Sequence, residues 1–249
     1  MTLRRVVVVA AAWLVVLGTA AGLSAAALSL LRDPEPILEY DAGRLVAAVP
    51  TSASAPTSSG TAGPVVDPAW VSSTAAASGL PAEAVRAYAT ATLRLAAEQP
   101  GCGLGWSTLA GIGEVESVHG TVGGRRLLVD GRSSRPIVGP ALDGRGPVAA
   151  IRAGADGAAL HGDPVWDHAV GPLQFLPGTW ATWGADGDGD GVADPQDLDD
   201  AAYAAGRYLC ADGGDLADGA AWQAAVLSYN HSASYVAAVY AAAVRLAEA

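Results

Sequence analysis

Positive charge is scarce in this chain of 249 residues, which carries 14 Lys and Arg side chains against 25 Asp and Glu, for a formal net charge of -11 at pH 7. Nucleic acids present closely spaced phosphates that require a basic surface, so this balance argues against DNA or RNA as a partner. The same balance excludes a polybasic attachment to anionic lipids. Phenylalanine occurs only once, and alanine inflates the 51% of hydrophobic residues.

Cysteine is also rare, with Cys102 and Cys210 as the only two. In a reducing cytosol these would be two buried free thiols, whereas in an exported protein a disulfide is the expected state. A bridge between them would close a long loop and tie two distant parts of the chain together. The compartment decides between the two interpretations, and the N-terminus indicates the compartment.

One long uncharged run covers residues 6–31, after Arg4 and Arg5 and before Arg32 and Asp33. A membrane-spanning helix needs about 20 residues, and the apolar region of a signal peptide has only about 7–15. The run is long enough to span a membrane, so we expect residues 1–32 to form a signal anchor or transmembrane segment.

Two alternatives remain open for this segment. The Ala25-Ala26-Ala27 triplet offers a cleavage site, so the segment can also be a removed signal peptide. A buried core helix is the weaker alternative, because nothing else in the chain could cover it. The arginines before the run and the acids after it predict a cytoplasmic N-terminus, with the rest of the chain outside, either membrane-anchored or secreted. No cysteine lies near the run, so we expect no lipid anchor.

Residues 33–79 are rich in Ala, Ser, Thr, Pro and Gly. The stretch 51–60 (Thr-Ser-Ala-Ser-Ala-Pro-Thr-Ser-Ser-Gly) has no periodic apolar face, so it cannot bury enough surface to offset its ordering entropy. We therefore expect residues 33–79 to be a flexible linker that precedes a domain at 80–249.

The domain at 80–249 has helical apolar periodicity over most of its length. Ser107 is a plausible N-cap of one helix and Gly120 lies beyond its end. Residues 120–165 are Gly-rich, which indicates long loops with a short hairpin around 126–129. No internal repeat is present. The sequence therefore predicts a mainly α domain with one large loop insertion and with helices at about 81–99, 107–119, 171–183, 199–210, 220–230 and 233–248.

Glu116 is the candidate catalytic residue of this domain. Helix geometry places Leu109, Ile112 and Glu116 on one face, while Glu114 points away from it as a solvated charge. A carboxyl group among apolar neighbours should have a raised pKa, which is what a general acid needs. The alternative that periodicity leaves open is a buried Glu116 paired with an arginine of the loops.

Four segments resemble the motifs of lytic murein transglycosylases, and they occur in that family's order. Residues 113–120 (Gly-Glu-Val-Glu-Ser-Val-His-Gly) resemble the Glu-Ser motif, and 169–180 contain the Gly-x-x-Gln-Phe-x-Pro pattern of the second motif. Residues 201–209 resemble the third motif, and 227–236 contain the Tyr-Asn pair of the fourth. Within that family, the motifs resemble those of the membrane-bound B type, as found in actinobacteria.

This resemblance implies a lysozyme-like α fold and cleavage of the β-1,4 bond between N-acetylmuramic acid and N-acetylglucosamine in peptidoglycan. The family releases a 1,6-anhydro-muramoyl end, with one carboxylate as acid and then base, and Glu116 takes that part here. A single carboxylate suits this chemistry, whereas most glycosidases need two. The expected partner is therefore a peptidoglycan glycan strand, and we expect a monomer.

The other motif residues are neutral, and we expect them to bind substrate. Gln174 and Asn230 can orient the acetamido and hydroxyl groups of the sugars. Tyr229 can donate a hydrogen bond to Glu116 or stack on a sugar ring, and Ser117 would hydrogen-bond near the reaction centre. We expect Phe175, Trp180 and Tyr208 to pack in the core and not to contact the sugars. We give no catalytic role to the helix-end histidines His119 and His231. Gly178 departs from the family, whose members often have Ser there.

The aspartate-rich segment 186–197 fits a calcium loop. Asp occupies positions 1, 3, 5, 9 and 12, and Gly191 stands at position 6, where a sharp turn is required. Asp197 is short for position 12, where Glu is usual, and Asp199 or Asp200 could replace it. The alternative is a solvated acidic turn that caps the next helix. The predicted ligands of a structural Ca²⁺ are Asp186, Asp188, Asp190, the Val192 carbonyl, Asp194 and Asp197.

Two other functions stay open at this stage. A true lysozyme-type hydrolase would use the same Glu116 and add water across the bond. A peptidoglycan-binding protein with an inactive site is a different class, and the complete set of Glu116, Gln174, Tyr229 and Asn230 argues against it.

Overall fold

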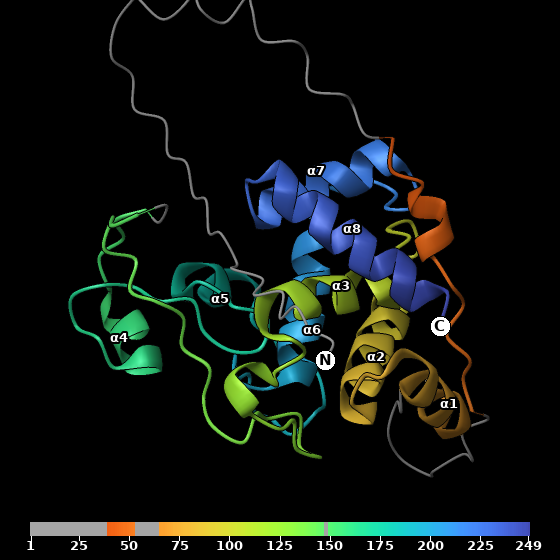
Figure 1. The fold of residues 1–249 in the computed structure, drawn as a ribbon, viewed down its shortest axis with the longest axis horizontal. Coiled ribbons are helices and arrows are strands. Elements are labelled where there is room, and N and C mark those ends of the chain that lie inside the picture. The colour runs from red at the N-terminus through yellow and green to blue at the C-terminus, as the bar shows by residue number, and fades with distance from the viewer. Residues whose placement is uncertain (1–38, 53–64, 147–148) are drawn as a thin grey trace, which may run out of the picture.

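The computed structural model describes residues 39–52, 65–146 and 149–249 (Figure 1). The predicted membrane segment at 1–32 lies outside these residues, and within them no helix is long and apolar enough to cross a membrane. The described residues form a mainly helical fold, as predicted, with isolated β-bridges and no extended strand. Its helices are η2 (Ala42–Leu45), α1 (Pro68–Ser78), α2 (Ala82–Glu98), α3 (Trp106–Ser117), η3 (Val122–Gly124), α4 (Ala155–His161), α5 (Pro177–Trp183), α6 (Leu198–Leu209), α7 (Gly219–Tyr229) and α8 (Ala233–Ala247).

Helix α3 lies at the centre of the helical body, and α8 packs along it (Figure 1). Small residues allow this close approach: a Cβ added to Gly111 would lie 2.7 Å from the Val239 carbonyl oxygen of α8. Nine of the twelve residues of α3 are buried. This burial on all sides fixes the helix that carries Glu116.

The prediction of a flexible linker through residue 79 is wrong for the described parts of that range. Helix α1 is capped by the Asp67 side chain, which accepts from the Ala69 N–H, and it ends at Gly79 with φ 76°. Leu45 and Val66 are buried in the common core. These apolar residues have no local periodicity because they pack against helices far away in the sequence.

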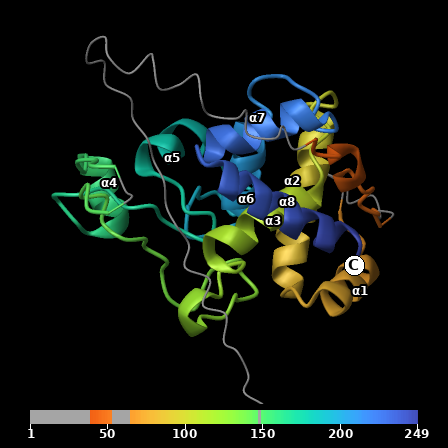
Figure 2. The same cartoon turned by 45° about the horizontal axis from the view of Figure 1, so that its top comes forward.

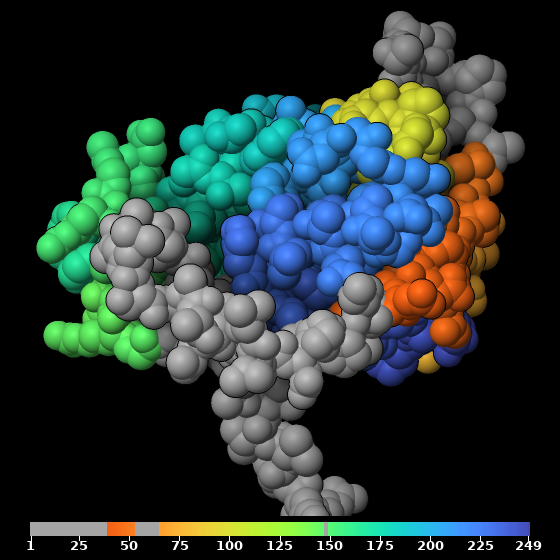
Figure 3. Space-filling view, turned by 90° about the horizontal axis from the view of Figure 1, so that it is seen from above, coloured from red at the N-terminus to blue at the C-terminus, as the bar shows by residue number. Residues whose placement is uncertain are grey.

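The segment 39–52 lies against the C-terminal helices (Figure 3). The ring of Tyr40 contacts those of Trp222 in α7 and Tyr240 in α8, with centroids 5.3 and 4.8 Å apart. The Asp41 N–H donates to the Tyr240 hydroxyl over 3.1 Å. The helical domain therefore begins well before residue 80.

Two helix boundaries differ from the prediction. Gly105, not Ser107, is the N-cap of α3; a Cβ there would collide with the Leu45 carbonyl, and the Ser107 hydroxyl donates to that same carbonyl instead. The predicted helix at 171–183 is helical only from Pro177. Its first half turns back on itself, with positive φ at Gly171 and Gln174.

The insertion after α3 lies on the opposite side of the molecule from α1 (Figures 1 and 2). It contains the expected hairpin, in which Leu127 and Ser133 form an antiparallel bridge. It also contains α4 and the short η3, which the prediction of loops missed. Residues 137–142 lie antiparallel to 167–171 and are joined to them by a bridge and by hydrogen bonds. In one of these the Gly139 N–H donates to the Ala169 carbonyl over 2.8 Å.

The two cysteines form the expected disulfide. Cys102 and Cys210 are bonded across a sequence separation of 108 residues, with their Cα atoms 5.5 Å apart. The bridge joins the segment before α3 to the end of α6. It therefore ties the helix that carries Glu116 to the third-motif helix.

Candidate active site

Glu116 stands in the last turn of α3, where it accepts a hydrogen bond of 2.6 Å from the Tyr235 hydroxyl of α8. Burial raises the pKa of the Glu116 carboxyl from 4.5 to about 8, and the Tyr235 bond partly opposes that shift. No neighbouring charged group contributes to the shift. The carboxyl is therefore protonated at neutral pH and able to give up its proton.

Glu116 does not pair with an arginine among the described residues, so the alternative that periodicity left open is wrong there. Arg245 pairs with Glu114 instead, and the ring nitrogen Nε2 of His119 lies 3.8 Å from the same carboxylate. The bond to His119, followed by that to Arg245, lowers the pKa of Glu114. Helical periodicity thus separated the two acids correctly, although Glu114 is ion-paired and only 34% exposed.

The chain after Glu116 adopts a strained turn. Val118 and His119 both have positive φ, of 53° and 56°, which is costly for side chains other than glycine. His119 is buried, and its Nδ1 lies 3.2 Å from the Tyr88 hydroxyl. Its contacts support the turn, which agrees with its omission from the catalytic residues.

Ser117 is bound within the protein. Its hydroxyl donates to the Pro172 carbonyl over 2.6 Å and accepts from the Gly120 N–H over 2.7 Å. The side chain is buried, so its hydrogen bonds join the Glu116 turn to the loop of the second motif. Ser117 follows Glu116 directly in the chain, but its hydroxyl is used for hydrogen bonds within the protein.

Tyr229 and Asn230 end helix α7 beside this site. The Tyr229 hydroxyl donates to the Leu173 carbonyl over 2.8 Å, so the expected bond to Glu116 is absent and Tyr235 supplies it. Burial first, and then the charge of Glu116, raise the pKa of Tyr229 well above 10. The buried Oδ1 of Asn230 accepts no hydrogen bond from the described residues.

Tyr235 was not among the predicted site residues. It is in direct contact with Glu116, although it lies 119 residues away in the sequence. The available signal was its place in the fourth motif, on the same short segment as Tyr229 and Asn230. The fourth motif could therefore have indicated Tyr235 as a site residue, whereas helical periodicity could not.

Gln174 is buried at the turn that replaces the first half of the predicted helix. Its Nε2 donates to the Gly171 carbonyl over 2.9 Å, and its backbone has φ 51°. The second-motif aromatics pack as expected: the ring of Phe175, 2% exposed, contacts those of Trp180 and Tyr229 at 5.3 and 5.9 Å. The Tyr208 hydroxyl donates to the Ser228 carbonyl.

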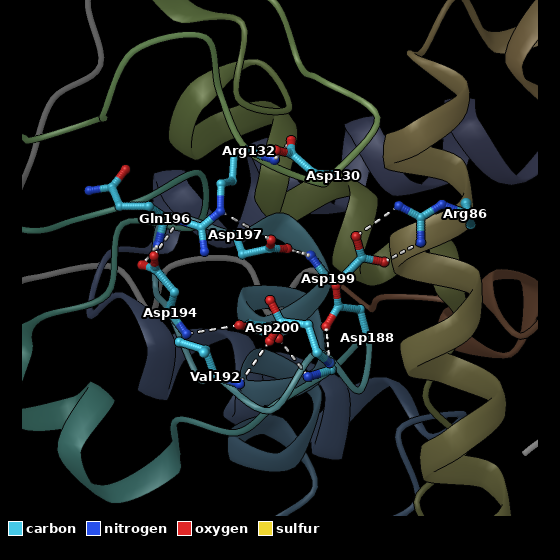
Figure 4. A network of polar contacts seen from close by, with 12 residues as sticks. Arg86, Asp130, Arg132, Asp188, Val192, Asp194, Gln196, Asp197, Asp199 and Asp200 are labelled. Carbon is cyan, nitrogen blue, oxygen red and sulfur yellow. Dashed lines mark hydrogen bonds and ion pairs between the residues drawn. The ribbon is translucent and has the colours of Figure 1, made fainter.

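The aspartate-rich loop only partly follows the expected ligand pattern. Asp186, Asp188 and Asp200 each offer a carboxylate oxygen within 4.8 Å of the others. Asp190 is not part of this group, and its carboxylate accepts from the Val192 N–H. Asp194 pairs with Arg132 (Figure 4). The predicted positions 5, 9 and 12 therefore lie outside this group, and Asp200 replaces Asp197.

Asp197 has the structural role of a helix cap. Its side chain accepts from the Asp199 N–H at the start of α6, so it caps the helix as the alternative predicts, but it is buried and not solvated. Burial raises the pKa of its carboxyl to about 7. Asp199 is held by two hydrogen bonds from Arg86, 2.7 and 2.9 Å long (Figure 4). Charged partners within the protein thus satisfy several of these acids.

The trio of Asp186, Asp188 and Asp200 fits a hard cation. Calcium and magnesium prefer carboxylate and carbonyl oxygens, and three close carboxylates repel one another without a cation. The Arg94 guanidinium donates to the Asp186 carbonyl over 2.9 Å, which fixes the loop against α2. The trio is remote in sequence from Glu116.

No family model matches this chain, and no curated protein or solved structure matches it significantly. The functional argument therefore depends on the residues and their geometry.

Proposed function

We propose that this chain is a peptidoglycan lytic transglycosylase with a lysozyme-like fold. The observation that carries the proposal is one partly buried carboxyl group, that of Glu116, which has a pKa of about 8 and a tyrosine hydroxyl as its hydrogen-bond partner. Most glycosidases need a second carboxylate as nucleophile or as base for water. Here no other acid contributes to the pKa shift of Glu116.

In the proposed reaction, Glu116 first protonates the oxygen that links the two sugars, and the bond from that oxygen to C1 of the muramoyl residue breaks. The resulting carboxylate then removes the proton of the muramoyl 6-hydroxyl. The 6-oxygen forms the new bond to C1, and Glu116 is protonated again. Tyr235 donates to the carboxylate and stabilises it between the two steps.

Neutral hydrogen-bonding groups hold the sugars in this proposal. The Oδ1 of Asn230 has no hydrogen-bond donor among the described residues, so it can accept from an N–H or O–H of the substrate once a rotation of the side chain exposes this enclosed atom. Gln174 donates one Nε2 hydrogen to Gly171 and has another for the sugar. An N-acetylated sugar provides both the donor and the acceptor that these amides need.

The remaining parts of the proposal concern the setting of the site. Asp186, Asp188 and Asp200 hold a structural Ca²⁺, which supplies charge neutralisation for the loop and no chemistry. The glycan substrate places the domain outside the cytoplasmic membrane, in agreement with the predicted anchor or signal at 1–32. The Cys102–Cys210 disulfide is compatible with that oxidising location.

Digestion of purified sacculi by the full chain, followed by mass spectrometry of the fragments, tests the proposal. Anhydro-muramoyl ends, lighter by one water than reducing ends, are the expected product. Reducing ends would assign the chain to the hydrolytic lysozyme type. Binding to sacculi without any new ends would identify a binding protein, and the catalytic role of Glu116 would then be wrong.

A further inference from the structure

The insertion sends one segment back to the candidate site. Residues 137–142 run antiparallel to 167–171, immediately before the second motif. The Gln196 side chain fixes the start of this segment, since its Oε1 accepts from the Ile137 N–H over 2.8 Å and its Nε2 donates to the Ile137 carbonyl over 2.9 Å. The segment is thus anchored at the acidic loop before it reaches Gly139.

His168 holds the segment at Gly139. Its Nδ1 lies 2.8 Å from the Gly139 carbonyl oxygen, and its Nε2 lies 3.2 Å from a carboxylate oxygen of Asp163. A carbonyl oxygen can only accept, so Nδ1 carries the proton. The side chain is 13% exposed, which protects this hydrogen bond from competition with water.

Gly139 in turn lies directly against Gln174. A Cβ added to Gly139 would lie 2.7 Å from the Oε1 of Gln174 and 3.3 Å from the Ala169 carbonyl oxygen. The other end of the Gln174 amide is bonded to the Gly171 carbonyl. The amide is therefore confined between the main chain of Gly139 on one side and that of Gly171 on the other.

We propose that His168 is a positioning residue, which acts through the main chain of Gly139 to hold the Gln174 amide where it binds the substrate sugar. This inference rests on the proposed function, because the sugar site of Gln174 belongs to it. It also gives the insertion a role: the insertion supplies the main-chain wall of the sugar site.

A role for His168 in folding alone is the competing explanation, and His161 provides the matched control. The ring of His161, the last residue of α4, lies 4.7 Å from the ring of His168. His161 bonds to Asp167, with Nε2 2.8 Å from Oδ1, and makes no hydrogen bond to Gly139. Loss of either histidine should affect the stability of the insertion, but only loss of His168 should affect Gln174.

The experiment is a double-mutant cycle in the full chain, with kcat/KM measured on isolated glycan strands. His168→Ala should lower kcat/KM by about 5- to 10-fold, the effect of one lost hydrogen bond. In the Gln174→Ala background the same substitution should have no further effect, because groups that act through one another are not additive. His168→Asn retains a donor near Nδ1 and should restore most of the activity. His161→Ala should combine additively with Gln174→Ala.

Additive effects of His168→Ala and Gln174→Ala would overturn the inference, as would a His168→Asn variant no better than His168→Ala. A crystal structure of the His168→Ala variant provides a readout that does not depend on activity. The Gln174 amide should be displaced there, and an unmoved amide would overturn the inference. Wild-type chain that leaves glycan strands intact would instead refute the proposed function itself.

Discussion

Replacement of Glu116 by Gln should abolish glycan cleavage and, at the same time, stabilise the fold. The folded chain holds the Glu116 carboxyl protonated up to a pKa of about 8, against an ordinary value of 4.5. The unfolded chain releases this proton above pH 4.5, and the folded chain does so only near pH 8. The stability of the wild type therefore falls as pH rises through this window, relative to a variant without the ionisable group.

The magnitude follows from the same two pKa values. One pKa unit corresponds to 1.36 kcal/mol, so proton linkage gives about 1 kcal/mol at pH 5 and about 4 kcal/mol at pH 8. The carboxyl retains some contact with solvent, so we take about 2–4 kcal/mol as the expected gain of Glu116→Gln at pH 8. Each kcal/mol raises the Tm of a domain of this size by about 2–4 °C.

Thermal unfolding of wild type and Glu116→Gln between pH 5 and pH 8 measures this gain. The difference in Tm should increase with pH, while anhydro-product formation falls at least about 100-fold. Glu114→Gln is the control on the same helix: it should lower the Tm, by an amount that stays nearly constant between pH 5 and pH 8 and shrinks only below about pH 4.5. The pKa of Glu114 is lowered, so its stabilising effect is present at neutral pH and is lost in acid. A Tm difference for Glu116→Gln that stays constant from pH 5 to pH 8 would refute the argument.

Three further changes test the site and its scaffold. Tyr235→Phe removes the hydrogen-bond donor to Glu116, so the pKa of that carboxyl should rise further. The alkaline limb of the pH profile of kcat/KM should then move upward by about one pH unit. An unmoved limb would show that Tyr235 does not set the pKa of Glu116. Added Ca²⁺ should raise the Tm and EDTA should lower it, a response that Asp200→Asn loses and Asp190→Asn keeps; no response in the wild type would remove the metal. Replacement of Cys102 and Cys210 by Ser should lower the unfolding free energy by up to about 4–5 kcal/mol, and two titratable thiols in the unreduced wild type would contradict the bridge.

Much of the helical body could be predicted because its signals are local. The periodicity that separated Glu116 from Glu114 depends only on the helix repeat, and the pairing of Cys102 with Cys210 followed because no other cysteine exists. The capping signals of α1, Asp67-Pro68 and Gly79, were also present, but the composition of the surrounding stretch obscured them.

The predictions that were wrong concern residues whose partners lie far away in the sequence. Asp194 and Asp197 stand at calcium-loop positions by spacing, yet Arg132 from the insertion pairs with the first and the start of α6 occupies the second. Gln174 was predicted inside a helix, but Gly171 has a positive φ, and a Cβ there would collide with the Pro195 carbonyl, so the chain turns at that point.

The sequence by itself determined that the chain is mainly helical, that Glu116 lies on an apolar face and that its two cysteines can only pair with each other. Only the tertiary structure decided that Tyr235 is the hydrogen-bond partner of Glu116, that Asp200 joins Asp186 and Asp188, and that the insertion returns to Gln174. The physical reason is the range of each interaction. Helical periodicity acts over three or four residues, whereas burial and hydrogen bonding join groups that only the folded chain brings together.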